Sequence, residues 1–237
     1  MPHVPTIVLV HSPFLGPTSM RPLAAALLRR ARPAVVTDLR AGVTEPPVHP
    51  RLAKVFAEAV VTAAPEGDLV LVGHSGAGPL LPTLAAAVDR QIAGLVLLDA
   101  GLPTPGRSWA ESAPTELVEQ LRGLAEGDRL PPWNTWFQPD PLPELVDDAA
   151  VRERIAAEQP RVPVAFLDEP RPAERWPGRM GYLLLSEAAY GREARAAAEA
   201  GWPVRRVRAH HLAAATEPEP VADAVLELVG ALLAPPT

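Results

Sequence analysis

The chain has 237 residues, of which 48% are hydrophobic, 21% are charged and none is cysteine, and its formal net charge is −6. At roughly 150 residues per domain, this length predicts one domain with room for an insertion, and the lack of cysteine excludes disulfide scaffolds, thiolate metal sites and cysteine nucleophiles. Mild acidity without a basic stripe argues against nucleic-acid binding, and no apolar run reaches the roughly 18 residues of a membrane-spanning helix.

Along the chain, short apolar runs alternate with longer stretches rich in alanine and leucine. The runs are almost continuously apolar, as expected for strands covered by helices on both faces. This alternation predicts a three-layer α/β fold whose sheet is mostly parallel and has about six strands. Thr216, followed by Pro218 and Glu219, is the predicted N-cap of the last helix. The predicted strands are 7–10, 34–37, 69–72, 92–98, 182–185 and 204–207, and the predicted helices are 21–31, 51–64, 79–88, 192–200 and 218–232.

The alternation stops between residues 102 and 179, a segment that holds four of the five tryptophans and no clear strand. Helical patterns lie only at 115–125 and 147–158. Because the segment falls between two predicted strands, it is predicted to be a helical cap inserted above the carboxyl edge of the sheet. The predicted organisation is a core of residues 1–101 and 180–237 with a cap of residues 102–179, in a single domain.

The strongest chemical signal is the run Gly73-His74-Ser75-Gly76, which lies between a predicted strand and a predicted helix. A serine on such a turn is exposed at the edge of the sheet, and small flanking residues let the strand and the helix approach closely. The amide of Gly76 would lie at a helix N-terminus and could donate to a developing oxyanion. The pattern predicts that Ser75 is a nucleophile and that Gly76 N–H stabilises the oxyanion.

These motifs resemble those of the α/β-hydrolase superfamily, and the resemblance covers nearly the whole chain. Ile7–Val10 with His11 resemble its first strand and oxyanion loop, and the run around Ser75 resembles its nucleophile turn. His210-His211-Leu212 resembles its catalytic-histidine turn, and the family pattern of His-Leu before a short loop and a proline selects His211 rather than His210. The chain is most similar to the small esterase and hydroxynitrile-lyase-like members, which implies an α/β-hydrolase fold and a catalytic triad.

The acid of the implied triad has two candidates. The superfamily usually places it after the penultimate strand, where this chain reads Ser186-Glu187-Ala188 and only Glu187 is acidic. A second arrangement, that of the haloalkane dehalogenases, places the acid at the end of the preceding strand, where Asp99 lies. Asp99 is the preferred residue to orient His211, because the order serine, aspartate, histidine follows the superfamily, and Glu187 is the alternative acid.

The oxyanion loop departs from the family pattern. Relatives usually read His-Gly-X and use the amide of X as the second donor, but His11-Ser12-Pro13 places a proline, which has no N–H, at that position. Ser12 can offer its hydroxyl instead, in the way that hydroxynitrile lyases use a threonine. Those enzymes also carry a lysine beside the catalytic histidine, whereas this chain has Leu212, so cyanohydrin cleavage is not favoured. A shifted loop with another amide pointing inward is the open alternative.

The predicted function is that of a cofactor-free serine hydrolase that cleaves a small or medium apolar ester, thioester or lactone. No dinucleotide, P-loop or HExxH motif is present, so neither a cofactor nor a metal is expected. The alternatives are a lyase, cyclase or epimerase that uses Ser75 and His211 for acid–base chemistry, and a catalytically silent ligand-binding protein. Aromatic side chains above Ser75 predict an apolar substrate pocket. Its predicted lining is Phe14, Trp109, Trp133, Trp136 and Phe137.

The expected partner is a small apolar molecule, with no nucleic acid and no membrane, and the chain is expected to act as a monomer or homodimer. Its first residues, Met1–Pro5, lack the basic and apolar regions of a secretion signal. A cytoplasmic location is therefore expected.

Overall fold

The computed structural model describes residues 4–64 and 66–235. Residues 1–3, 65 and 236–237 of the predicted core lie outside the described residues. They include most of Met1–Pro5, the stretch that lacks the features of a secretion signal. Within the described ranges, six strands form one parallel sheet in the order β2-β1-β3-β4-β5-β6, which confirms the predicted fold class. Each strand end lies within two residues of its prediction. The strands are β1 (Thr6–Val10), β2 (Ala34–Thr37), β3 (Leu69–His74), β4 (Ile92–Leu98), β5 (Met180–Leu184) and β6 (Val204–Arg206).

The strands are apolar throughout because both faces of the sheet are covered. In β1, Val8 and Val10 belong to one hydrophobic cluster, whereas Ile7 and Leu9 belong to a second cluster on the other face. Successive side chains of a strand point to opposite faces, so a sheet buried on both sides needs apolar residues at every position.

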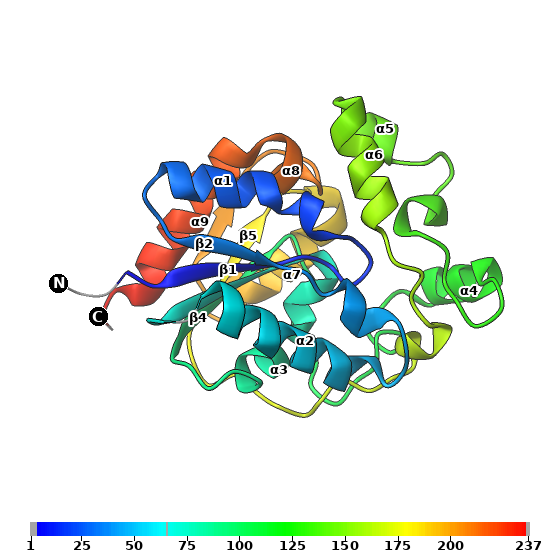
Figure 1. Ribbon diagram of the computed structural model, residues 1–237, viewed down its shortest axis with the longest axis horizontal. Coiled ribbons are helices and arrows are strands. Elements are labelled where there is room, and N and C mark those ends of the chain that lie inside the picture. Colours follow the sequence, from blue (N-terminus) through cyan, green and yellow to red (C-terminus); the bar gives the residue numbers. More distant parts are fainter. Residues whose placement is uncertain (1–3, 65, 236–237) are drawn as a thin grey trace.

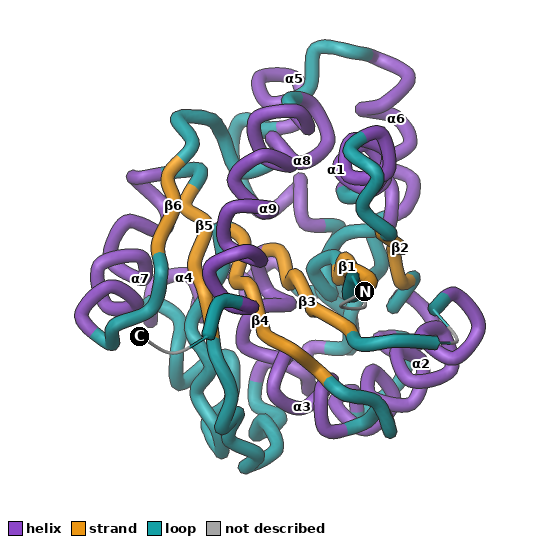
Figure 2. The backbone as a smooth tube through the Cα atoms, turned by 90° about the vertical axis from the view of Figure 1, so that its left-hand side faces the viewer, coloured by secondary structure: helices purple, strands orange, loops and turns teal. Residues whose placement is uncertain are grey.

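Two sets of helices enclose the sheet, as Figures 1 and 2 show. The first set packs on the cluster that contains Ile7, and the second packs on the cluster that contains Val8. No helix in the described ranges is both long and apolar enough to cross a membrane. The first set is α1 (Arg21–Arg29), α8 (Ala213–Thr216) and α9 (Pro218–Leu233), and the second is α2 (Val48–Ala63), α3 (Leu81–Ala86) and α7 (Glu187–Glu199).

Several helix boundaries differ from the predictions, including that of α2, which begins at Val48 rather than at residue 51. The helix predicted at 192–200 is α7, which begins five residues earlier, at Glu187. The helix predicted at 79–88 is divided into the 3₁₀ helix η3 (Ser75–Leu80) and α3. The predicted N-cap was wrong: Thr216 ends α8 and its hydroxyl lies 3.0 Å from His210 Nε2, while Glu217 precedes α9 without a side-chain cap.

Residues 102–179 connect β4 to β5, and all of them are described, yet none joins the sheet. In Figure 1 this segment lies to the right of the sheet layers, where α4, α5 and α6 are drawn in green. Glu158 ties the segment to the 3₁₀ helix η1 (Pro17–Ser19), because its carboxylate accepts the N–H and the hydroxyl of Thr18, both at 2.7 Å. The elements of the segment are α4 (Thr115–Leu124), η4 (Trp133–Trp136), α5 (Leu142–Leu145), α6 (Ala149–Glu158) and η5 (Val164–Leu167).

Candidate active site

Ser75 stands at the sharp turn between β3 and η3. Its φ of +56° lies in the left-handed region, which residues other than glycine adopt rarely and at an energetic cost. The turn is closely packed, since a Cβ added at Gly78 would lie 2.5 Å from the Cβ of Ala100. Strand, turn and helix therefore form the strained junction that presents a serine hydroxyl at the edge of a sheet.

Ser75, His211 and Asp99 form one hydrogen-bonded chain. His211 Nε2 lies 3.0 Å from Ser75 Oγ, and His211 Nδ1 lies 2.7 Å from Asp99 Oδ2. An ionised carboxylate can only accept, so Nδ1 carries the proton of the neutral imidazole and Nε2 is left to accept the hydroxyl proton of Ser75. The structure thus brings together the nucleophile, base and preferred acid that the sequence suggests, from the ends of β3 and β4 and from the loop before α8.

Asp99 is held in its position by the backbone after β5. It is fully buried, its φ is +45°, and its carboxylate accepts the N–H groups of Leu185 and Ser186, each at 2.9 Å, as well as the hydroxyl of Ser186. Burial acts to raise the pKa of Asp99, but the hydrogen bonds from His211 and Ser186, together with the charge of His211, hold that pKa below its ordinary value. Asp99 is therefore a carboxylate at neutral pH.

The alternative acid and the alternative histidine are engaged elsewhere. Glu187, at the exposed start of α7, pairs with Arg206 at 2.6 Å and Arg195 at 3.3 Å. The ring of His210 contacts the N–H of Leu212 and the hydroxyl of Thr216. The structure brings neither Glu187 nor His210 into the hydrogen-bonded chain of Ser75.

The two residues predicted for the oxyanion hole, Gly76 and Ser12, are neighbours. A Cβ added at Gly76 would lie 3.1 Å from Ser12 Oγ, and Gly76 N–H belongs to the first turn of η3, where amides have no partner in the helix. The other possible donors are occupied by Ser12, because Phe14 N–H donates to its hydroxyl at 3.3 Å and Leu15 N–H to its carbonyl at 3.0 Å. Ser12 itself is 1% exposed and lies behind the cavity wall, with its own hydroxyl hydrogen available to an acceptor.

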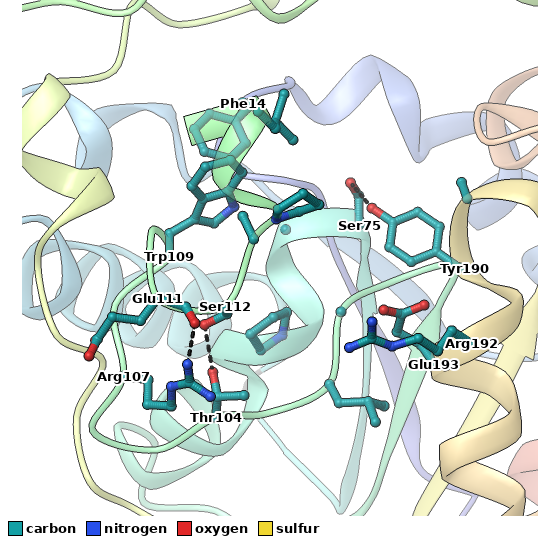
Figure 3. Close-up of a pocket in the computed structure, with 18 of the residues that line it drawn as sticks. Phe14, Ser75, Thr104, Arg107, Trp109, Glu111, Ser112, Tyr190, Arg192 and Glu193 are labelled. Atoms are coloured by element: carbon teal, nitrogen blue, oxygen red, sulfur yellow. Dashed lines mark hydrogen bonds between the residues drawn. The ribbon is translucent and has the colours of Figure 1, made fainter. Parts of the chain in front are cut away.

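A cavity of about 750 Å³ opens above Ser75 (Figure 3). All five aromatic residues predicted for the pocket line it, and the Phe14 ring lies 4.8 Å from that of Trp136 and 6.3 Å from that of Trp109. The predicted apolar pocket is apolar only along part of its wall, because the rest of the wall is polar and charged. The polar side chains include Thr104, Arg107, Glu111, Ser112, Arg171 and Arg192.

Tyr190 is a site residue that the sequence analysis missed. Its hydroxyl lies 3.4 Å from Ser75 Oγ, and its ring stacks on that of His211 with centroids 5.3 Å apart. Burial raises the pKa of Tyr190 to about 12, so the hydroxyl is protonated at neutral pH and can donate to Ser75. A helix predicted to begin at residue 192 leaves Tyr190 in a loop, whereas α7 begins at Glu187 and carries Tyr190 in its first turn. No local pattern in the sequence marks this residue.

His74 supports the loop that carries His211. Its Nε2 donates to the backbone carbonyl of His211 at 2.8 Å, the two rings are 4.6 Å apart, and its Nδ1 has no partner among the described residues. Burial, aided by the nearby charge of His211, lowers the pKa of His74 to about 3. The ring is therefore neutral at physiological pH, which suits a group that fixes the base rather than replaces it.

Comparison with known proteins identifies a family but no near relative. The family model described as the alpha/beta hydrolase family matches residues 7–224. No curated protein sequence matches the chain.

Solved structures resemble the whole fold at low sequence identity. An extracellular alpha/beta-hydrolase from a Paenibacillus species, said to share homology with tobacco salicylic acid binding protein 2, superposes with a TM-score of 0.72 at 18% identity over 94% of this chain and 98% of that chain. A pyrethroid hydrolase from Sphingobium faniae JZ-2 gives 0.69 at 20% identity over 97% and 98%. Polyneuridine aldehyde esterase gives 0.71 at 16% identity over 96% and 100%. These likenesses establish the fold.

Proposed function

The chain belongs to the alpha/beta hydrolase family, and on that basis we propose that it is a serine hydrolase that cleaves an ester, thioester or lactone. The observation that carries the proposal is the chain of hydrogen bonds from Ser75 Oγ through His211 to Asp99, at 3.0 and 2.7 Å. The strained backbone of Ser75 supports it, because such strain is retained where the surrounding fold holds a reactive group in place. The hydrolase and esterase names of the structural neighbours are consistent with this chemistry.

In the first half of the proposed reaction, Ser75 Oγ attacks the substrate carbonyl carbon while His211 Nε2 takes its proton. Asp99 holds Nδ1–H and stabilises the imidazolium that forms. The tetrahedral intermediate then collapses: the bond to the leaving alcohol, thiol or lactone oxygen breaks, and that group takes the proton from His211. The product of this half is an acyl ester of Ser75.

In the second half, a water molecule attacks the acyl carbon as His211 accepts one of its protons. The bond from the acyl carbon to Ser75 Oγ breaks, Ser75 regains its proton from His211, and a carboxylic acid leaves. Every group transferred in the two halves comes from the substrate, the water or these side chains. The cycle therefore closes without a cofactor.

The proposed oxyanion hole combines Gly76 N–H with the hydroxyl of Ser12. Donors at about 2.7–3.1 Å from the developing oxyanion supply much of the rate enhancement in acyl transfer. Pro13 has no N–H, and the amides of Phe14 and Leu15 already donate to Ser12. Two hydroxyls remain near the nucleophile: that of Tyr190, 3.4 Å from Ser75 Oγ, and that of Ser12, whose oxygen lies against Gly76. We assign the second donor to Ser12, because its hydroxyl lies beside the residue that carries the first.

The proposed substrate has an apolar part of small to medium size. The aromatic side chains around Phe14 give the cavity an apolar wall next to Ser75, where such a part would be buried. We further propose that residues 102–179 act as the cap that supplies most of that wall, since Trp109, Trp133 and Trp136 belong to the segment.

Pro13 favours a second candidate function, acid–base catalysis without an acyl-enzyme. A site with one amide donor stabilises an oxyanion less well than a site with two, and a lyase, cyclase or epimerase would use Ser75 and His211 only to move protons. The two functions differ in one intermediate: hydrolysis passes through an acyl ester of Ser75, and the second candidate does not.

The test is steady-state and pre-steady-state turnover of p-nitrophenyl esters of two to eight carbons. The wild type should release a burst of p-nitrophenol equal to the enzyme concentration when deacylation is slow, and Ser75→Ala should lose at least 10³-fold in kcat/KM. Ser19→Ala is the control, because Ser19 is also buried and its hydroxyl donates only to the carbonyl of Gly16. Ester turnover by Ser75→Ala at more than a tenth of the wild-type rate would contradict the proposal.

A further inference from the structure

Arg171 is a buried charge at the polar end of the cavity. It follows η5 in the chain and is 7% exposed. The two hydrogens of its Nη1 are shared among four acceptors: the hydroxyls of Thr104 and Ser112, at 2.8 and 2.9 Å, and the carbonyls of Arg107 and Ser108, at 3.1 and 3.0 Å. Every one of these acceptors is neutral.

The charge of Arg171 has no ionic partner in the part of the chain that the structure describes. No carboxylate there lies within 4.0 Å of its guanidinium, and the carboxylate of Glu111, on the same wall, accepts the N–H of Ser108 at 2.6 Å. Burial lowers the pKa of Arg171 to about 10, so the guanidinium remains charged at neutral pH. The charge of Glu111 acts on Arg171 only from farther away, so no carboxylate among the described residues pairs with it directly, whereas buried charges normally form a direct pair.

One edge of the guanidinium has no hydrogen-bond partner. Nε and Nη2 make no hydrogen bond to any described residue, and neither is fully buried. Arg171 is among the residues that line the cavity, so this edge is the part of its guanidinium that a ligand there could contact. The hydrogen bonds of Nη1 fix the plane of the guanidinium. Nε–H and Nη2–H remain as two parallel donors, the arrangement that binds the two oxygens of a carboxylate.

The surrounding wall favours an anion, although the chain as a whole is acidic. The cavity is lined by three arginines and two glutamates, whereas the chain has a formal net charge of −6. Figure 3 shows Thr104, Arg107, Glu111 and Ser112 grouped at the lower left, with Trp109 above them, whereas Ser75 and Tyr190 lie at the upper right and Arg192 and Glu193 lie below Tyr190. One end of the cavity thus holds Arg107 and its hydrogen-bonding neighbours, and the other end holds the catalytic serine.

We propose that Arg171 is an anion-binding subsite and that the substrate is an ester with an apolar body and a carboxylate at its far end. This inference rests on the proposed function and narrows it to acid-bearing substrates. The carboxylate binds the free edge of Arg171, the apolar body lies along the aromatic wall, and the scissile carbonyl reaches Ser75. Arg107, which is exposed and lies with Thr104 and Ser112, adds positive potential at the same end of the cavity, whereas Arg192 lies on the other side beside Glu193 (Figure 3).

The experiment compares two ester series that differ only in charge. One series is the mono-p-nitrophenyl esters of straight dicarboxylic acids from six to ten carbons, and the other is the same esters with the free acid methylated. At the chain length that spans the cavity, the wild type should have a kcat/KM at least 10-fold higher for the acid than for its methyl ester. Arg171→Gln should lower kcat/KM for the acid by about 10–100-fold and leave the methyl ester within about 3-fold. The control is Arg175→Gln, an exposed arginine of the same segment, which should change neither series.

Two outcomes would overturn the inference. If the wild type shows no preference for the acid at any chain length, there is no anion subsite. If Arg171→Gln lowers both series equally, Arg171 serves only to hold residues 104–112, since loss of that loop would affect charged and neutral esters alike.

A binding measurement keeps the inference separate from the catalytic proposal and from the folding of the variant. Calorimetric titration of Ser75→Ala, which keeps Arg171, with free suberate and with dimethyl suberate should show at least 10-fold tighter binding of suberate, weakened by added salt. Binding of suberate without ester turnover by the wild type would overturn the proposed function and keep the subsite. Equal binding of the two ligands would overturn the subsite and keep the function.

Discussion

Asp99 and Ser75 share an uncommon backbone conformation, since both have positive φ although neither is glycine. Each follows a strand of the sheet, and each carries a side chain that must reach His211 from a fixed direction. Local strain of this kind costs on the order of 1–3 kcal/mol per residue and persists where the surrounding structure holds it. At the residue scale, the strained backbone lowers the stability of the fold by this amount and sets the directions of these two side chains.

The two candidate acids can be separated by matched substitutions. Asp99→Asn should lower kcat/KM by roughly 10⁴-fold, because the amide no longer holds the Nδ1–H tautomer of His211. Glu187→Gln should change it by less than about 3-fold, because Glu187 pairs with exposed arginines. Ester turnover by the two purified variants checks this. A large effect at Glu187 with a small effect at Asp99 would place the acid after the penultimate strand.

The proposed second oxyanion donor is tested by Ser12→Ala. Loss of one donor to a tetrahedral intermediate costs roughly 10²–10³-fold in kcat, so turnover should fall by that factor while KM changes little. Circular dichroism should show an unchanged fold, because Phe14 N–H is the one described group that forms a hydrogen bond with this hydroxyl. An unchanged kcat would show that Ser12 plays no part, and Gly76 N–H would then act with some other donor.

Residue roles were predictable where the chain carries a local motif, and unpredictable where contacts come from distant segments. Ser75 and His211 stand in short patterns with a chemical reason, and Asp99 ends a strand. Tyr190 and Arg171 stand in no such pattern. Tyr190 meets Ser75 because α7 begins at Glu187, and Arg171 meets Thr104 across a segment without periodic sequence, so only tertiary packing reveals them.

At the scale of elements, the strand bounds were predicted most accurately, because a short and continuously apolar run is typical of a strand in a sheet covered on both faces. Helix ends were less certain. Ala213–Thr216, which begin with three alanines, form one helical turn, and this turn takes Thr216 away from the capping position of α9. The predicted helices at 115–125 and 147–158 correspond to α4 and α6, whereas α5 and the 3₁₀ helices lie among prolines that hide any periodicity.

The attachment of α6 to the core gives a prediction at this scale. Glu158→Ala should lower the free energy of unfolding by about 1–3 kcal/mol, because the N–H and hydroxyl of Thr18 lose a charged, partly buried acceptor. Glu153→Ala, an exposed change on the same helix, should alter it by less than about 0.5 kcal/mol. Urea denaturation of both variants measures the difference, and equal effects would show that the contact does not stabilise the segment.

At the scale of the whole molecule, burial of His74 makes stability depend on pH. The pKa of His74 is lowered to about 3 in the folded protein, from about 6.5 in an unfolded chain. The unfolded chain therefore binds more protons between these values, so the stabilisation is fully present above about pH 6.5 and falls as the pH decreases toward 3. The charged and titratable groups near the ring are His211, Asp99 and His11.

The matching experiment is urea denaturation of the wild type and His74→Gln between pH 4 and 7. The wild type should lose up to about 1.4 kcal/mol per pH unit more than the variant, whose amide can still donate to the carbonyl of His211 but does not titrate. Parallel pH dependences would show that His74 is not held neutral by the fold.

The general fold was predictable because the pattern of alternating strands and helices extends over most of the chain and leads to one sheet. The cavity was only half predictable. Its aromatic wall follows from the tryptophans of residues 102–179, but its charged wall depends on how that segment folds back over η3 and α7, which no local pattern specifies.

The central claim, that Ser75 is the nucleophile of a hydrolase, is tested most directly by intact-protein mass spectrometry after treatment with a fluorophosphonate. Attack by an activated serine displaces fluoride and leaves one phosphonyl group on the enzyme. The wild type should gain a single adduct that maps to Ser75, and Ser75→Ala should gain none under the same conditions. An adduct on another residue, or no adduct on the folded wild type, would contradict the account.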